Sequence, residues 1–173
     1  RGRVATSGPP RARAVANGAL RFVASTAHGA ALTSLRAGGR EYLVSSYPKP
    51  GSFSWFRPFY GGIAPFAFTE DWPGNLYRER FRIRDASRGT WSGVRLRANA
   101  KASDLPKGLR VDVEYLTRPR CPIVACLLTA RNASHGRLEL TAGFWAFLGV
   151  GRTPTFEAEF ARLGSRRWGD AGW

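Results

Sequence analysis

Short runs of alternating apolar and polar residues, separated by glycine and proline turns, constrain the fold of this chain more than any other feature. The alternation is clearest in Leu109–Leu116, and it recurs in Phe81–Arg84 and Val94–Arg97. A period of two is typical of strands that have one buried and one solvated face. The turns recur at a spacing that suits a sandwich or meander rather than βαβ units. The sequence therefore predicts an all-β fold, an antiparallel β-sandwich with few or no helices.

Two further segments extend the expected sheet. Ile123–Ala130 is continuously apolar, so we expect a central strand that is covered on both faces. Leu138–Phe144 continues the sheet after a turn at Asn132–Gly136. Phe156–Leu163 suits a helix and a strand almost equally well and stays unassigned.

The length of 173 residues suits one globular domain. Residues 1–18 begin with a polar, turn-rich stretch, so we interpret them as a flexible arm or linker, followed by a single sandwich domain over residues 19–173. The longest apolar run, Ile123–Leu128, is far shorter than the ~18 residues of a membrane span. No signal-peptide pattern is visible at the start, which slightly favours the cytoplasm.

A formal net charge of +15 arises almost wholly from arginine. Such a charge attracts acidic partners, namely nucleic acid, anionic lipid headgroups or uronate-bearing sugars. The alternative is a compositional bias toward Arg, Ala and Gly, which requires no anionic partner.

The two cysteines, Cys121 and Cys126, are five residues apart. In an extended strand this separation is ~17 Å, whereas the α-carbons of a disulfide lie within ~7 Å of each other. We therefore expect the two thiols to stay unpaired and to pack in the core. Two cysteines without a neighbouring histidine are too few for a zinc site, and the sequence predicts neither a metal nor a cofactor.

Six short segments together match the layout of a known group of sandwich proteins. They are Gly29–Leu35, Gly38–Leu43, Tyr60–Pro65, Trp91–Val94, Leu105–Leu109 and Glu114–Arg118. Over roughly Leu20 to Gly151, the chain resembles the galactose-mutarotase-like superfamily of β-supersandwich domains. The resemblance implies a sugar-handling surface on the concave face of a large sheet. Because complete members of that fold are longer, it also implies a domain that is truncated at its C-terminus.

Mutarotases of that superfamily use a histidine as general acid and a glutamate as general base to open the sugar ring. The histidines of this chain are His28, at the opening of the first expected sandwich strand, and His135, in a hairpin turn. Neither lies where the acid of the family belongs. The resemblance therefore implies a carbohydrate-binding or carbohydrate-processing domain without mutarotase catalysis, and no catalytic residue is assigned.

The segment Phe53–Phe81 holds ten of the 22 aromatic residues. Its glycines and prolines exclude one long helix or strand, so loops and short strands must present the rings. Ring faces cover the apolar side of a pyranose, while charged and amide groups bond its hydroxyls. We expect a sugar platform of Trp55, Tyr60, Trp72 and Tyr77, supplemented by Arg57, Glu70, Asp71 and Asn75. The alternatives are that the rings fill an irregular core and that the two acids form a solvated turn.

The segment Arg78–Arg84 follows the rings. If it is one strand, Phe81 and Ile83 lie on one face, and the other face carries Arg78, Arg80, Arg82 and Arg84. Arg95 and Arg97 extend the cationic face if their strand is a neighbour. Adjacent like charges destabilise a sheet unless an anion neutralises them, so we expect an anion-binding face that flanks the platform. Glu79 points to the other face, and the alternative is an exposed surface screened by salt.

Three functions are compatible with these features. The first is a carbohydrate-binding or carbohydrate-processing domain, whose ligand could be anionic. The second is a basic β protein that binds nucleic acid, although no RNA-recognition, zinc-finger or helix-turn-helix signature is visible. The third is a structural or assembly domain, with its rings and arginines buried against the rest of a longer chain or a second copy.

Overall fold

The computed structural model describes residues 11–27, 29–47, 49, 60–133 and 136–149, and the backbone of two short strands further on. Its elements are β1 (Ala12–Ala16), β2 (Leu20–Ser25), β3 (Leu32–Ala37), β4 (Arg40–Glu41), β5 (Ile63–Phe68), η1 (Leu76–Arg78), β6 (Arg82–Arg88), β7 (Trp91–Asn99), β8 (Arg110–Thr117), β9 (Val124–Arg131), β10 (Thr141–Ala146), β11 (Glu157–Phe160) and β12 (Gly164–Arg167). The three-residue η1 is the sole helical element in this described part of the chain.

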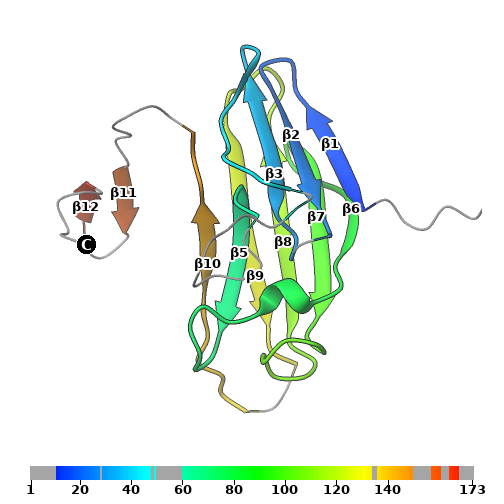
Figure 1. The fold of residues 1–173 in the computed structure, drawn as a ribbon, viewed down its shortest axis with the longest axis vertical. Coiled ribbons are helices and arrows are strands. Elements are labelled where there is room, and N and C mark those ends of the chain that lie inside the picture. The colour runs from blue at the N-terminus through cyan, green and yellow to red at the C-terminus, as the bar shows by residue number, and fades with distance from the viewer. Residues whose placement is uncertain are drawn as a thin grey trace, which may run out of the picture.

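Two antiparallel sheets lie face to face (Figure 1). The larger sheet has six strands in the order β1-β2-β3-β5-β10, with β4 paired to β3, and the smaller has the order β6-β7-β8-β9. The pair β11–β12 forms a separate hairpin. The all-β, antiparallel sandwich predicted from the sequence is confirmed. No helix among the described residues is long and apolar enough to cross a membrane.

Tyr115 of β8 joins the two sheets at the centre of the core. Its side chain is fully buried, and its ring centroid lies 6.2 Å from that of Phe144 in β10. The hydroxyl donates to the carbonyl oxygens of Ala30, at 2.9 Å, and Ile63, at 3.3 Å. Burial raises the pKa of Tyr115 well above its ordinary value. The phenol therefore stays a neutral donor that ties the smaller sheet to the backbone of the larger one.

The strands expected from alternation are present, but their burial differs from the prediction. Ile123–Ala130 is not central, because β9 lies at the end of the four-stranded path and its residues are only partly buried. The covered strand is β8, in which residues 111–117 are all buried. The alternating sequence of β8 suggested a solvated face, but the polar residues on that face, Asp112 and Glu114, lie beneath arginine side chains.

Two expected boundaries are also wrong. Residues 12–16, assigned to a flexible arm, form β1, which pairs along its whole length with β2, while residues 1–10 lie outside the described part. Leu138–Phe144 does not continue the sheet of β9. Instead, β10 begins at Thr141 and pairs with β5 in the larger sheet. The chain thus changes sheets between β9 and β10, a step that strand periodicity cannot reveal.

Glycines allow the chain to enter β5. Gly61 and Gly62 both have positive φ values, 68° and 74°. A Cβ at Gly61 would lie 2.1 Å from the carbonyl oxygen of Val44, and one at Gly62 would lie 2.3 Å from that of Leu32. Only glycine satisfies both the conformation and the close backbone approach. These residues therefore fix the position of β5 beside β3.

Both cysteines are free thiols, as predicted. Cys126 of β9 packs against the core, and burial raises its pKa to about 11. Cys121 lies in the turn before β9, where its carbonyl oxygen accepts a hydrogen bond from the Asn17 side chain at 2.7 Å. The core role expected for both thiols is therefore confirmed for Cys126, whereas Cys121 belongs to a turn.

Candidate functional site

A group of aromatic side chains covers the outer surface of the larger sheet at β5 and β10. We call it the ring face, and it consists of Phe66, Phe68, Trp72 and Trp145. The ring centroids of Phe66 and Trp145 are 5.0 Å apart, and those of Phe66 and Phe68 are 6.2 Å apart and stacked. Trp72 meets Trp145 edge-on at 5.6 Å and leaves 51% of its surface exposed. A large ring is therefore presented to solvent on a support of other rings.

Strand alternation and register create the ring face. In β5, Ile63 packs against the core, and Phe66 and Phe68 lie on the opposite face of the strand. In β10, Phe144 faces Tyr115 in the core, so the next residue, Trp145, points outward. Gly143 lies opposite Phe66 in the ladder, and a Cβ there would lie 2.9 Å from the ring. The glycine thus provides the space in which the ring lies flat across the strand.

The rings of the predicted platform occupy different places. Trp72 belongs to the ring face, whereas Tyr60 has its ring 6.4 Å from that of Tyr47. The backbone of Tyr77 passes so close to Gly29 that a Cβ on the glycine would lie 2.6 Å from its α-carbon. Trp55 and Arg57 lie outside the described residues. The described ring contacts therefore place Tyr60 and Trp72 in two separate groups.

Three of the four polar residues of the predicted site, Glu70, Asp71 and Asn75, line one small pocket after β5. Glu70 and Asp71 are exposed in the bend after β5, where they line a small pocket of about 100 Å³ with Asp104. Asn75 is occupied, since its amide oxygen accepts from the Asp104 backbone at 2.8 Å and its amide nitrogen donates to the Asp104 carboxylate. No metal-binding group of three His, Cys, Asp or Glu residues occurs among the residues that the structure describes. Glu70 and Asp71 therefore lie in an exposed turn directly before Trp72.

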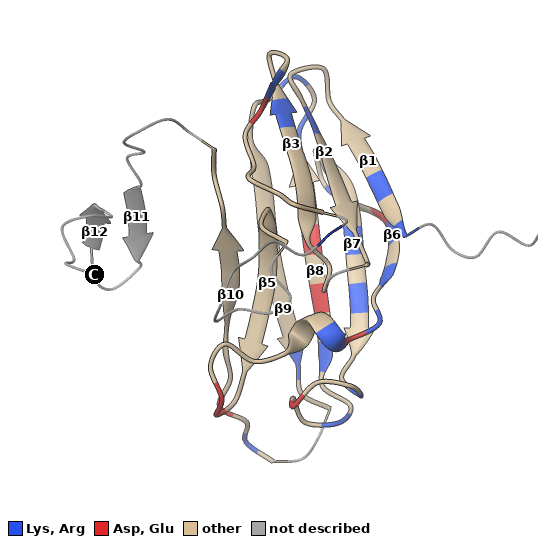
Figure 2. Cartoon of the chain, viewed as in Figure 1, with Lys and Arg blue, Asp and Glu red and all other residues tan. Residues whose placement is uncertain are grey.

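The smaller sheet carries arginines along β6 and β7 (blue in Figure 2). Arg82 and Arg84 of β6 lie opposite Arg97 and Arg95 of β7. The strand that carries Arg95 and Arg97 is therefore the neighbour of β6, which was the condition for these two arginines to extend the cationic face. The next strand supplies the acids, because Asp112 lies opposite Arg97 and Glu114 lies opposite Arg95. Hence the neutralising anions for the β7 arginines come from the protein itself.

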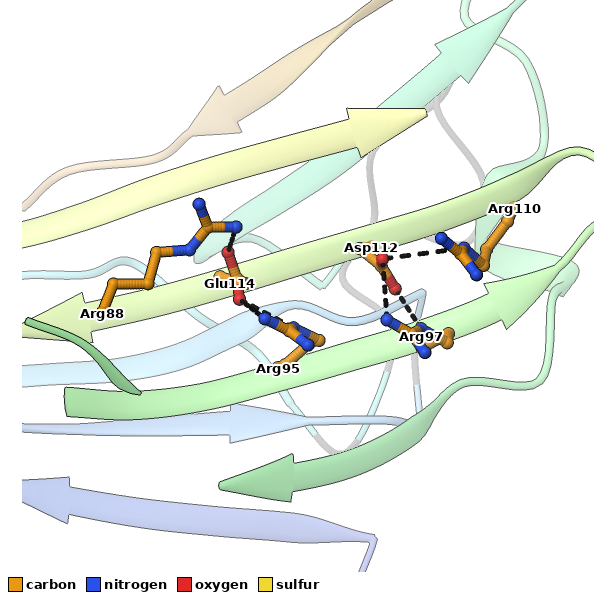
Figure 3. A network of polar contacts seen from close by, with 6 residues as sticks. All are labelled: Arg88, Arg95, Arg97, Arg110, Asp112 and Glu114. Atoms are coloured by element: carbon orange, nitrogen blue, oxygen red, sulfur yellow. Dashed lines mark hydrogen bonds and ion pairs between the residues drawn. The ribbon is translucent and has the colours of Figure 1, made fainter. Parts of the chain in front are cut away.

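Each buried carboxylate on β8 bridges two arginines (Figure 3). Glu114 contacts Arg88 at 2.5 Å and Arg95 at 2.7 Å, and its side chain is 2% exposed. Asp112 contacts Arg97 at 2.5 Å and Arg110 at 3.9 Å. The hydrogen bond that Arg97 donates to the Asp112 carboxylate is the main reason that the pKa of Arg97 is raised. The long arginine stems cover the two acids, which explains why both are buried on an outer face.

The four arginines of the predicted strand do not share one face. Arg78 ends η1, Arg80 lies in the following link, and β6 begins only at Arg82. Between η1 and β6, Glu79 is buried, and its Oε1 accepts hydrogen bonds from the backbone N–H groups of residues 101–103 and from the Ser103 hydroxyl, at 2.6–2.9 Å. Burial alone would raise the pKa of Glu79, but these hydrogen bonds lower it below its ordinary value.

The platform was expected to be flanked by arginines, but within the described part of the chain the ring face and the arginines of β6 and β7 lie on different sheets. The ring face lies on the outer surface of β5 and β10, neither of which carries a charged residue (Figure 2). The arginines lie on the other sheet, and β6 stacks near β1, to which the Arg13–Asp85 ion pair of 2.7 Å connects it. Since β1 and β10 end the path of the larger sheet on opposite sides, the two features occupy opposite sides of the sandwich.

Comparisons with known proteins do not identify a relative: no family model, curated protein sequence or solved structure matches the chain.

Proposed function

We propose that this chain is a carbohydrate-binding β-sandwich domain and that the ring face holds the sugar. The observation that carries the proposal is Trp72, a tryptophan that is half-exposed yet held at a fixed angle against Trp145. A half-exposed indole that lies on a group of other rings leaves an apolar patch in water, and such patches are a feature of interaction sites. The C–H face of a pyranose supplies the apolar surface that would cover it.

The surroundings of Trp72 support binding of a polar ligand with one apolar side. Glu70 and Asp71 precede the indole directly and are exposed, so their carboxylates are available to accept hydrogen bonds from sugar hydroxyls. Trp145, which itself packs against Phe66, restricts the tilt of the Trp72 indole. A platform ordered before binding loses little side-chain entropy when the ligand arrives, which favours affinity.

The test is Trp72→Ala, with Trp91→Ala as the matched control. Trp91 is a partly buried tryptophan on the other sheet, and the guanidinium of Arg118 lies 4.7 Å from its ring centroid. A panel of neutral oligosaccharides built from glucose, galactose, mannose or xylose would be titrated by calorimetry, with circular dichroism as the check on folding. We expect Trp72→Ala to weaken binding about ten-fold, since stacking on one ring contributes ~1.4 kcal/mol.

The proposal fails if the wild-type protein binds no member of the panel, or if Trp72→Ala binds as well as wild type. Equal losses in both tryptophan variants would indicate a general effect on the fold. If Trp72→Ala unfolds the domain, Glu70→Gln and Asp71→Asn test the same site, because both side chains are exposed and their replacement should not disturb the fold. Unchanged sugar binding in both of these variants would count against the proposal.

A further inference from the structure

A second pocket lies where β6 begins and β7 ends, and it has a volume of about 600 Å³. Arg80 and Arg82 approach it from the link and the start of β6, Arg97 from β7, and Lys101 from the loop after β7. We call these four residues the cationic pocket. A neighbouring depression of about 550 Å³ shares Lys101 and adds Lys107. Five cationic side chains therefore line the two neighbouring pockets at this end of the smaller sheet.

Glu79, the one carboxylate that lines the pocket, is already engaged. It is 5% exposed, and its Oε1 accepts four hydrogen bonds from the loop of residues 101–103. The loop thus holds this acid as a hydrogen-bonded, ionised carboxylate, and among the described residues it forms no ion pair with the pocket arginines. Within the described residues, Arg80, Arg82 and Lys101 have no acidic partner. Four cationic side chains and one carboxylate line the pocket, so its lining keeps a net positive charge.

Arg97 is held in place while part of its guanidinium stays available. Asp112 binds Nε at 2.5 Å and Nη2 at 3.1 Å, and the side chain is 44% exposed. Its remaining nitrogen, Nη1, is not part of this bidentate pair. A guanidinium fixed on one edge presents its other donors in a defined direction, an arrangement suited to the oxygens of a sulfate or phosphate group.

We propose that the cationic pocket binds a tetrahedral oxyanion, the sulfate or phosphate ester group of a sugar or other small ligand. Guanidinium and ammonium groups recognise such oxygens by charge-assisted hydrogen bonds. The single aromatic residue of the pocket lining, Phe81, is 7% exposed. Single-stranded nucleic acid is bound by stacking its bases on exposed rings, so this lining favours an esterified sugar or small molecule over nucleic acid. The site is separate from the ring face and does not depend on it.

The test compares two double variants that remove the same charge. Arg80→Ser with Arg82→Ser removes two pocket arginines. Arg21→Ser with Arg84→Ser removes two exposed arginines outside the pocket lining, and Arg84 is only two residues further along β6 on the same face. The probes are inorganic sulfate, inorganic phosphate, a sulfated oligosaccharide with its desulfated counterpart, and a single-stranded oligonucleotide of matched charge.

We expect the sulfated oligosaccharide to bind at least about ten-fold more tightly than its desulfated counterpart. The pocket variant should lose about ten-fold in that affinity, whereas the control should stay within about two-fold of wild type. Inorganic sulfate and phosphate should compete, and the more effective ion identifies the ester. Equal losses in both double variants, no loss in either, or tighter binding of the oligonucleotide than of the sulfated sugar would overturn the proposal. Binding of neutral sugars at the ring face should be unchanged in the pocket variant, so the two proposals fail independently.

Discussion

Replacing Glu114 with glutamine tests whether the protein neutralises its own arginines. The substitution keeps the shape of the side chain but removes the charge that Arg88 and Arg95 share, at 2.5 and 2.7 Å. The amide nitrogen would also face a guanidinium, donor against donor. We expect Glu114→Gln to lower the free energy of unfolding and to leave the sheet register unchanged.

The magnitude follows from the exposure of each partner. A hydrogen bond to a charged group contributes ~1.5–3 kcal/mol, and removing one member of a fully buried ion pair costs about 3–5 kcal/mol. Here the acid is 2% exposed, but Arg88 and Arg95 are 53% and 37% exposed, so water can solvate the guanidinium groups that remain. The expected loss is therefore ~2 kcal/mol, at the lower end of these ranges. For a chain of this size, that corresponds to a Tm lowered by about 4–8 °C.

The assay is urea unfolding followed by circular dichroism, with thermal unfolding as a second measurement. Glu139→Gln is the matched control, because Glu139 pairs with Arg137 at 3.3 Å while their side chains are 84% and 89% exposed. A pair of this kind contributes ~0.5 kcal/mol or less. If Glu114→Gln unfolds at the same urea concentration as the control, the carboxylate does not hold the arginines, and the anion for the β7 arginines must come from elsewhere.

Two further predictions concern single ionisable groups. The pKa of Glu79 is lower in the folded state than its ordinary value of 4.5, so its stabilising contribution is present above pH 4.5 and is lost as the pH falls through the lowered pKa. Glu79→Gln should therefore destabilise the domain at pH 7 more than at pH 3 in urea unfolding, and an equal difference at both values would contradict this assignment. Because burial raises the pKa of Cys126 to about 11, its thiol should resist an aromatic disulfide reagent at pH 8 until urea unfolds the chain. Cys126→Ser identifies which thiol reacts, and rapid labelling of Cys126 in the native protein would be the contrary result.

The sequence is most informative where one period dominates. Alternation in Phe81–Arg84 and Leu109–Leu116 predicts the strands β6 and β8, because side-chain direction in a strand depends only on position. Burial is less predictable, because it depends on what lies across the sheet. Asp112 and Glu114 mimic a solvated face in the sequence, yet arginines from β6, β7 and the start of β8 cover them.

The contacts of the candidate site also depend on residues that are distant in the sequence, so they could be predicted only in part. Trp72 could be singled out because it follows two acids in a ring-rich segment, but Trp145 lies 73 positions away and reaches it only through the pairing of β10 with β5. No local signal specifies that pairing, since a strand that changes sheets has the same periodicity as one that does not. The burial of Glu79 was unpredictable for the same reason, because its hydrogen bonds come from residues 101–103, which are more than twenty positions away in the sequence.

The separation of rings from arginines follows from the sandwich itself. Each strand has one face in the core, so a charged residue and an exposed ring can share a surface only when their strands belong to the same sheet. Phe66 and Trp145 belong to the larger sheet, and Arg82 and Arg97 belong to the smaller one. A small ligand therefore reaches either the ring face or the cationic pocket. A chain that contacts both must pass around an edge of the sandwich, so adding anionic groups to a short sugar should increase its affinity for the pocket without improving its contact with Trp72.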